Sequence, residues 1–321
     1  MLLDLFKEKR CFKLVCGAGN EDEKEIEKLV ALYSKAGCNF FDLCAKPEIV
    51  EAAKRGLKYA GIEKDRYICV SIGISGDPHA SKAEINPELC INCCNCKATC
   101  KQNAINSEEV CEVNRKRCIG CGQCIKACPQ NAISRIDCAK DINEILPPLL
   151  DMGIDCVEFH IIGDNEEEIF TKWNDINNLF KGTLCISIDR SKQGDEDLVK
   201  RVKKLLECRK PYTTIIQADG IAMSGGEDNY RKTLQAVAIA EMFESAKLPA
   251  YIMVSGGTNS KTTELAKMCE VDIQALAIGS FARKIVREYI DRDDFLENEE
   301  IFNLALEKAK ALVDVSLRNL K

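Results

Sequence analysis

Eight short apolar runs divide most of the chain into units of similar length, and this repeat constrains the fold more than any other feature. The runs begin at Phe12, Phe40, Tyr67, Cys156, Thr183, Thr213, Ala250 and Ile273. Their length and their branched and aromatic residues predict β-strands, and helical patterns lie between them. Eight strand-then-helix units in succession predict a parallel (β/α)8 barrel, an α/β fold of the TIM-barrel type. An open doubly wound sheet is the alternative, and the number of units favours the barrel.

The spacing of these runs also locates an insertion. Counted from Lys13, the second and third strands each start 27 residues after the one before, and so does the fifth after the fourth. The step from the third to the fourth strand is 89 residues, which exceeds 27 by 62. We therefore predict a discontinuous barrel at 1–80 and 138–290, an inserted domain at 81–137, and a C-terminal helix at 291–321 packed on the barrel.

The inserted segment carries a repeated cysteine pattern. The pattern C-x2-C-x2-C-x3-C occurs at Cys90, Cys93, Cys96 and Cys100, and again at Cys118, Cys121, Cys124 and Cys128. It is typical of bacterial two-cluster ferredoxins, in which three close thiolates bind one 4Fe-4S cluster and the fourth binds the other. We predict cluster I on Cys90, Cys93, Cys96 and Cys128, and cluster II on Cys118, Cys121, Cys124 and Cys100. Two structural zinc sites are the alternative, but zinc motifs usually pair two C-x2-C units across a longer loop.

Other residues of the inserted segment have weaker signals. Cys94 and Cys111 are left without a place in either motif; we interpret them as buried thiols, with ligand exchange at Cys94 as the alternative.

The inserted segment is more basic than the rest of the chain. Lys and Arg outnumber Asp and Glu in it by eight to six, so the segment carries a formal charge of +2 and the rest of the chain -8. We expect Arg115, Lys116 and Arg117 to help to dock an acidic electron carrier.

Composition excludes several classes of protein. The first thirty residues do not resemble a signal peptide, and no apolar stretch is long enough to span a membrane. We therefore expect a cytoplasmic protein, in which 20 cysteines serve metal binding or thiol chemistry rather than disulfides. The formal net charge of -6 argues against binding to nucleic acid.

Polar residues fall at the strand ends that face the barrel interior, where enzymes of this fold hold their active sites. Asp42, Asp189 and Asp219 are candidates for proton transfer or ligand anchoring, with buried structural carboxylates as the alternative. The chain has two histidines, His79 and His160, at the ends of neighbouring strands. Either could bind a ligand or transfer protons, although a single histidine more often has a structural role.

Glycine-rich turns follow the last two predicted strands. They read SGGTNS from Ser255 and IGSFARK from Ile278. Loops at these two places in such barrels commonly bind phosphate through backbone N–H groups at a helix start. We predict a phosphate site at Gly256, Gly257, Gly279 and Ser280, with tight packing as the alternative reason for the glycines.

Four segments together resemble the LdpA family of iron-sulfur proteins. They are FKLVCGAG from Phe12, DPHASKAE from Asp77, the two cysteine motifs, and the stretch from SGGTNSKTTELA to IGSFARK. The resemblance extends to about Lys284 and implies two 4Fe-4S clusters on the eight motif cysteines. The family is also associated with relaying cellular redox state to the circadian clock, but that role does not carry over to this chain, because it depends on partners that the sequence does not show.

Two functions follow from these features. The first is an electron-transfer or redox-sensing iron-sulfur protein. The alternative is a reductase, in which the inserted domain supplies electrons to a flavin phosphate or another phosphorylated small molecule at the barrel mouth. Because no G-x-G-x-x-G motif follows a strand, a nicotinamide cofactor is not indicated. We expect a protein electron donor such as ferredoxin or flavodoxin.

Overall fold

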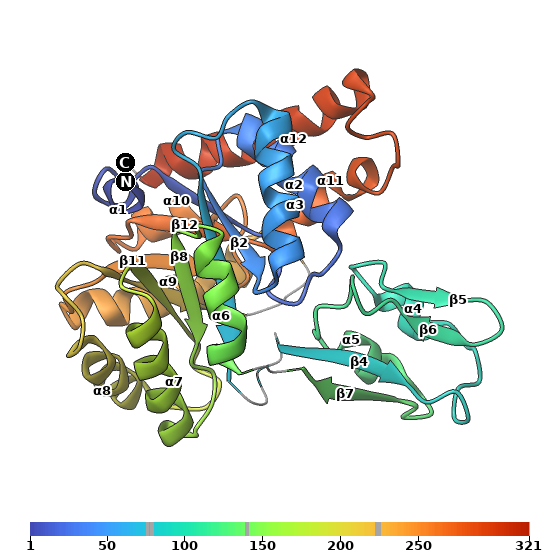
Figure 1. The fold of residues 1–321 in the computed structure, drawn as a ribbon, viewed down its shortest axis with the longest axis horizontal. Coiled ribbons are helices and arrows are strands. Elements are labelled where there is room, and N and C mark those ends of the chain that lie inside the picture. The colour runs from blue at the N-terminus through green and yellow to red at the C-terminus, as the bar shows by residue number, and fades with distance from the viewer. Residues whose placement is uncertain (75–76, 78–79, 139–140, 222–225, 321) are drawn as a thin grey trace.

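The eight predicted strands form a closed parallel barrel, which confirms the predicted fold class (Figure 1). The computed structural model describes residues 1–74, 77, 80–138, 141–221 and 226–320. The barrel strands are β1 (Cys11–Val15), β2 (Phe40–Cys44), β3 (Tyr67–Gly73), β8 (Cys156–His160), β9 (Thr183–Ile188), β10 (Thr214–Asp219), β11 (Tyr251–Ser255) and β12 (Ala275–Ile278). Each strand pairs in parallel with its neighbours, and β1 closes the ring against β12.

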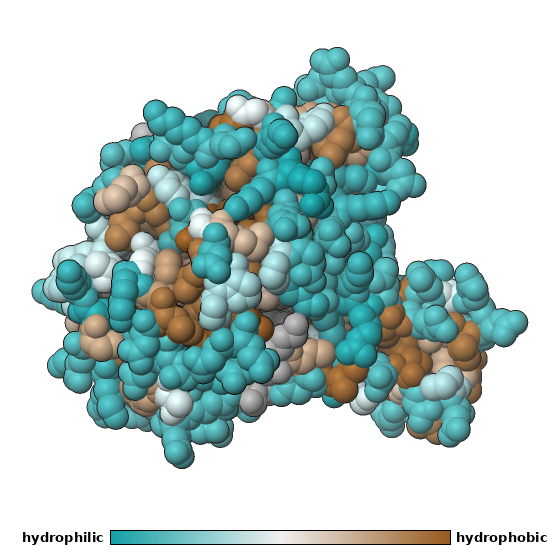
Figure 2. All heavy atoms as spheres, viewed as in Figure 1, coloured by the Kyte–Doolittle hydropathy of each residue, from teal (hydrophilic) through white to brown (hydrophobic). Residues whose placement is uncertain are grey.

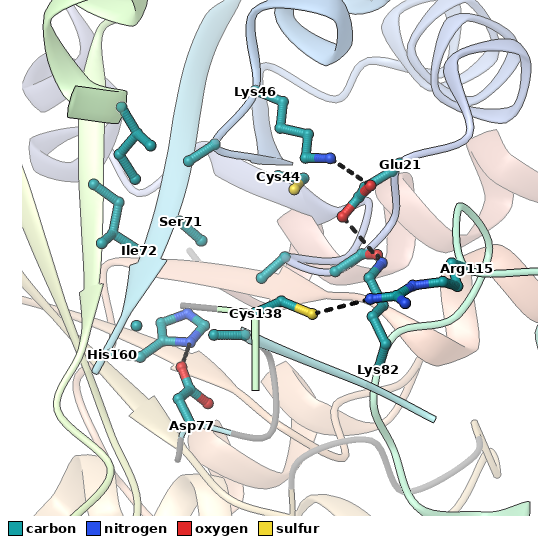
Figure 3. Close-up of a pocket in the computed structure, with 16 residues that line it drawn as sticks. Glu21, Cys44, Lys46, Ser71, Ile72, Asp77, Lys82, Arg115, Cys138 and His160 are labelled. Carbon is teal, nitrogen blue, oxygen red and sulfur yellow. Dashed lines mark hydrogen bonds and ion pairs between the residues drawn. The ribbon is translucent and has the colours of Figure 1, made fainter. Parts of the chain in front are cut away.

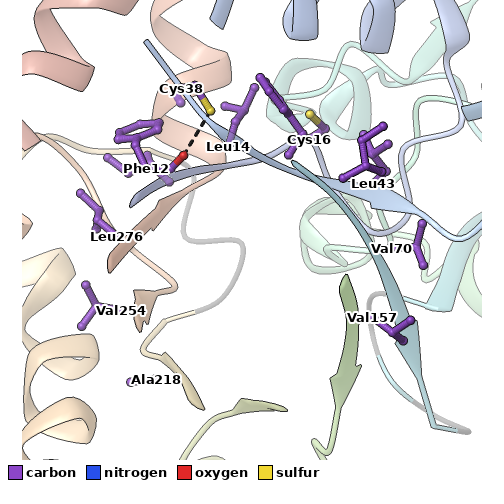
Figure 4. Close-up of a cluster of buried hydrophobic side chains, with 14 of the residues drawn as sticks. Phe12, Leu14, Cys16, Cys38, Leu43, Val70, Val157, Ala218, Val254 and Leu276 are labelled. Carbon is purple, nitrogen blue, oxygen red and sulfur yellow. Dashed lines mark hydrogen bonds between the residues drawn. The ribbon is translucent and has the colours of Figure 1, made fainter. Parts of the chain in front are cut away.

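Helices cover the outside of this barrel. They are α2 (Glu23–Ala36), α3 (Pro47–Ala60), α6 (Ile142–Asp151), α7 (Glu166–Leu179), α8 (Asp195–Leu206), α9 (Tyr230–Ser245), α10 (Thr262–Met268) and α11 (Ser280–Ile290). Local chemistry sets their ends: α2 begins after Asp22, whose side chain accepts a hydrogen bond from the Glu25 N–H, and ends at the left-handed Gly37. Outward-facing residues of the strands, such as Leu14, Val70 and Val157, belong to the apolar core between strands and helices (Figure 4).

Two further helices complete the barrel. The short helix α1 (Leu2–Lys7), which the sequence patterns did not predict, packs its buried face against the inward residues at the N-terminal end of the strands. The Phe6 ring lies 6.5 Å from the Phe40 ring and 5.7 Å from the Tyr251 ring. The long C-terminal helix α12 (Glu299–Leu320) packs on α2, α10 and α11. One end of the barrel is therefore closed by apolar side chains, and the other end remains for a site.

Residues 81–137 form a separate lobe beside the barrel (Figures 1 and 2). Its elements are β4 (Ser81–Ile85), α4 (Asn95–Thr99), β5 (Ile105–Ser107), β6 (Cys111–Val113), α5 (Gln123–Ala127) and β7 (Ile133–Asp137). Strands β4 and β7 are antiparallel, and Ser81 pairs with Asp137. The two ends of the lobe therefore leave and re-enter the barrel side by side.

Charged and polar contacts hold the lobe against the barrel. Arg117 of the lobe forms ion pairs with Glu25 at 3.3 Å and with Asp291 at 2.7 Å. The buried Arg283 of α11 donates to the Gln102 side-chain oxygen at 3.0 Å. These contacts orient the lobe relative to the barrel mouth. Among the described residues, no helix combines the length and apolar composition that a membrane span requires.

We expect Gly56→Ala to destabilise the barrel, because α3 lies very close to α2 at this position. A Cβ atom there would come within 2.5 Å of the Glu27 carbonyl oxygen, whereas a Cβ at Gly194 would meet nothing within 4 Å. Overpacking should outweigh the gain in helix propensity and lower the free energy of unfolding by about 1–2 kcal/mol. Anaerobic urea unfolding tests this, with Gly194→Ala as the control, expected within about 0.5 kcal/mol of the wild type. Equal changes in the free energy of unfolding for the two substitutions would show that the close contact between α2 and α3 adds no cost at Gly56.

Candidate functional site

Six thiols of the lobe line one small cavity, and four of them belong to the two cysteine motifs. Cys90, Cys93 and Cys96 of the first motif line this cavity of about 20 Å³ together with Cys128 of the second motif. The Cys128 sulfur also accepts a hydrogen bond from the Ala132 N–H at 3.3 Å. Four thiolates around one space, with N–H groups directed at sulfur, are the donor set that 4Fe-4S clusters require.

The other four motif cysteines lie together on the barrel side of the lobe. Burial, and to a smaller extent the neighbouring thiols of Cys121, Cys118 and Cys100, raise the pKa of the Cys124 thiol to about 12. Since like charges repel, this effect shows that Cys100 of the first motif lies near the three thiols of the second. A cluster bound here would supply the positive charge that keeps four thiolates together. This donor set therefore also fits a 4Fe-4S cluster.

The internal repeat explains why Cys94 is left over. Cys94 precedes α4 just as Gly122 precedes α5, and both residues are left-handed, with φ of 61° and 73°. Cys94 therefore takes the place of a turn glycine. The Cys94 sulfur lies 3.7 Å from the Asn92 side-chain oxygen, and the Cys111 thiol donates to the same oxygen at 3.3 Å. Both thiols line the cavity of the first group.

The three basic residues expected to dock a carrier have different surroundings. Arg117 is engaged with acidic residues of the barrel, as described above. Lys116 is 69% exposed and lies 4.0 Å from the Glu23 carboxylate, and Arg115 contacts the Cys138 thiol at 3.7 Å. The exposed positive charge of this segment is thus carried by Arg115 and Lys116.

A buried lysine organises the polar interior of the barrel. The Lys13 side chain has no exposed surface, and its ammonium donates to Glu158 and, at 3.1 Å, to Gln217. Burial alone would lower the pKa of Lys13, but the carboxylates of Asp42 and Glu158 outweigh burial and raise it well above its usual value. Burial raises the pKa of Asp42 to about 6, against the opposing effect of Lys13. Lys13 therefore stays charged, and Glu158 is its main counterion.

His160 lies above this lysine, between two carboxylates. Its Nδ1 is 3.0 Å from Asp77 and its Nε2 is 3.0 Å from Glu158. Burial alone would lower the pKa of His160, but Asp77 and then Glu158 outweigh it and raise that pKa well above the usual value. The ring is therefore an imidazolium at neutral pH. The sequence analysis did not select Lys13 or Asp77 as site residues, although a single lysine in the apolar β1 run was a visible signal.

One cavity at the barrel mouth gathers seven of the nine predicted barrel residues. This cavity, which we call the barrel-mouth cavity, has a volume of about 70 Å³. Its lining includes Asp42, His160, Asp219, Gly256, Gly257, Gly279 and Ser280. Asp189 is not among the lining residues: β9 ends at Ile188, and the Asp189 carboxylate accepts hydrogen bonds from the Ser191 N–H and hydroxyl at 2.9 and 2.7 Å. His79 lies outside the described residues.

The glycines of this cavity have both a packing role and a place in its wall. Gly256 and Gly257 have φ of 69° and 76°, and a Cβ on either would collide with Asp219 or with the Lys232 carbonyl. Packing thus accounts for the absence of side chains at these two positions.

Helix α11 starts at Ser280 in the same wall of the cavity. Arg283 also lines the cavity, and its buried Nε has no hydrogen-bond partner among the described residues. Free N–H groups of a helix start beside a guanidinium suit a phosphate group.

Comparisons with known proteins agree with the lobe chemistry. A 4Fe-4S binding domain model matches residues 111–134, and the model of the light dependent period A C-terminal domain matches residues 148–316. Light dependent period A of Synechococcus elongatus is 30% identical over 287 residues, which cover 85% of this chain and 78% of that protein. The cysteine lobe on a (β/α)8 barrel defines an iron-sulfur protein. Within that class, the chain belongs to the light dependent period A family.

Solved structures with a similar arrangement have little sequence identity to this chain. The YdjI aldolase of Escherichia coli K12 is 8% identical with a TM-score of 0.48, covering 99% of this chain and 92% of the aldolase. A tryptophan synthase of M. tuberculosis is 9% identical with a TM-score of 0.49, covering 100% of this chain and 96% of that one.

We expect the effects of Lys13→Met and Glu158→Gln on the free energy of unfolding to be far from additive. Either substitution alone leaves a buried charge without its main counterion and should lower the free energy of unfolding by about 3–5 kcal/mol. The double variant removes both charges, so it should be at least about 2 kcal/mol more stable than the sum of the two single effects. Urea unfolding of the four proteins under anaerobic conditions measures this coupling. Strict additivity would mean that the two groups do not stabilise each other.

Proposed function

We propose that this iron-sulfur protein binds two 4Fe-4S clusters and serves electron transfer or redox sensing. The observation that carries the proposal is the crossed arrangement of the thiols: Cys128 joins the first group and Cys100 joins the second. When bound, such clusters exchange single electrons at potentials set by sulfur hydrogen bonds, charge and solvent exposure. The backbone N–H groups of Ala104 and Ala132, at equivalent places in the repeat, donate to Cys100 and Cys128.

The two groups of thiols have different surroundings, which supports a direction for electron flow. Cys93 of the first group is exposed, and the nearby Leu89 and Ile91 are 51% and 61% exposed. An exposed apolar patch beside a redox centre suits transient contact with a protein carrier such as ferredoxin or flavodoxin. The second group faces the barrel. A redox-sensing role is also consistent with the light-dependent period in the name of the Synechococcus relative.

A reductase is the second candidate, because the barrel-mouth cavity adjoins the second group of thiols. Ile119, the residue after Cys118, lines that cavity. The α11 start and Arg283 would hold the phosphate of a flavin or another small molecule. The imidazolium of His160 lines the same cavity and could supply a proton to a ligand that accepts electrons there.

Iron content tests the number of clusters. We expect about eight iron atoms and eight sulfides per wild-type chain, and about four of each in Cys93→Ser and in Cys121→Ser. Cys94→Ser, which changes a cysteine outside both ligand sets, should retain the full content. Iron and acid-labile sulfide analysis of anaerobically purified protein, with circular dichroism to verify folding, provides the measurement. Full content in Cys121→Ser, or loss of half in Cys94→Ser, would refute the assigned ligands.

The contents of the barrel test the second candidate. Denaturation of the anaerobically purified protein should release a flavin or another phosphate-bearing compound, detected by mass and absorbance. His160→Ala should retain both clusters but release less of this compound, because the cavity loses its buried cation. Full clusters without any released compound would reject the reductase and leave the electron-transfer or sensing role.

A further inference from the structure

A second and larger cavity lies between the barrel mouth and the lobe (Figure 3). We call this space, of about 360 Å³, the interdomain cavity. Loops that follow β1, β2 and β3 form its barrel side, and Lys82, Arg115 and Cys138 lie on its other side. His160 borders both this cavity and the barrel-mouth cavity. Neither the cysteine motifs nor the glycine turns take part in its lining.

Basic side chains from three separate segments meet at the interdomain cavity. Lys46 follows β2, Lys82 lies in β4, and Arg115 lies between β6 and α5. The acidic lining residues are Glu21 and Asp77. Glu21 is shared, since its carboxylate contacts the Lys46 ammonium at 2.5 Å and the Lys82 ammonium at 3.2 Å. One carboxylate thus balances two ammonium groups.

The other charged groups around the cavity do not cancel its excess of positive charge. Asp77 pairs with His160 at 3.0 Å, and the structure shows no ion pair to Arg115 among the described residues. The side chains of Lys46 and Lys82 are only 24% and 5% exposed. Charges that are partly removed from water attract a counterion more strongly than charges on an open surface. The cavity therefore favours an anion.

The other walls indicate an organic ligand rather than a bare inorganic ion. Ile72 and Ile145 line the cavity together with Ala45 and Cys44. A volume of about 360 Å³ falls in the range of small-molecule sites, which usually combine apolar walls with a few convergent polar groups. The cationic side would hold carboxylate or phosphate groups, and the apolar side would contact the carbon skeleton.

We propose that the interdomain cavity binds a small organic anion with carboxylate or phosphate groups, held by Lys46 and Arg115. The ammonium of Lys82, which donates to the carbonyls of Gly19 and Cys118, adds positive charge beside the ligand. Because Lys46 belongs to the barrel and Arg115 to the lobe, the ligand bridges the two parts of the protein. The site is separate from the phosphate position at Gly279 and Ser280. Its existence does not depend on the number of clusters or on catalysis at the barrel mouth.

Calorimetric titration of the anaerobic, cluster-containing full chain tests this proposal with citrate, malonate and inorganic phosphate as separate probes. At least one probe should bind once per chain with a dissociation constant of about 1 mM or lower. Arg115→Met and Lys46→Met should each weaken that binding by about tenfold or more, corresponding to the loss of one charged contact. Lys116→Met removes a neighbouring exposed charge that does not line the cavity, and it should leave the affinity unchanged.

Three results would overturn the proposal. One is the absence of binding by all three probes. Another is binding that persists in both Arg115→Met and Lys46→Met, since the probe would then occupy another place such as the barrel mouth. The last is an equal loss in Lys116→Met, which would indicate unspecific attraction to the basic segment. Iron analysis of the same samples separates these results from a failure of the proposed cluster ligands.

Discussion

The buried ammonium of Lys13 is the charge on which the barrel interior depends. Taking an ammonium out of water costs several kcal/mol unless carboxylates and hydrogen-bond acceptors surround it. Glu158, Gln217 and Asp42 provide these groups from three other strands. The Glu158 carboxylate is in turn fixed by hydrogen bonds that it accepts from the Gln217 amide at 2.8 Å and from the His160 ring at 3.0 Å. The pair of Lys13 and Glu158 thus helps to position His160 at the mouth, whereas the charge of His160 depends first on Asp77 and then on Glu158.

The lobe contributes a second constraint through the unequal use of its two repeats. Gln102 and Asn103 of the first repeat contact Arg283 and Asp291 of the barrel. Their counterparts in the second repeat, Gln130 and Asn131, are exposed. Because the fourth cysteine of each motif crosses to the other group, this docking places the group with Cys100 and Cys118 next to the barrel. A nearly symmetric module thereby gains one inner and one outer group of thiols.

The sequence predicted those parts of the molecule that depend on local periodicity. All eight strands lie where apolar runs occur, because each buried strand must carry such a run whatever surrounds it. The rule that the ends of parallel strands lie on one face of a barrel correctly predicted that residues as distant as Asp42 and Ser280 share one cavity. The same rule was wrong for Asp189, since it assumes that the strand continues to that residue. The chain instead turns after Ile188, and the carboxylate bonds to Ser191.

Other features depend on tertiary contacts that no local pattern encodes. Lys13 was visible as a lysine in an apolar run, but its role requires knowing that Glu158, far along the chain, faces it. Helix α1 is too short for a periodic signal, and only its packing on Phe40 and Tyr251 reveals why it forms. The interdomain cavity requires the orientation of the lobe, which depends on contacts such as Arg117 with Asp291.

The proposed clusters and the proposed anion site meet at Lys82. Its buried ammonium lines the interdomain cavity and donates to the carbonyl of Cys118 at 2.8 Å. Negative charge added beside this ammonium favours the oxidised, less negative form of a cluster held by Cys118. Since linkage is reciprocal, reduction of that cluster would weaken binding of the anion by the same free energy. Under the function that we propose, one lysine would therefore couple the electron supply to the occupancy of a small-molecule site.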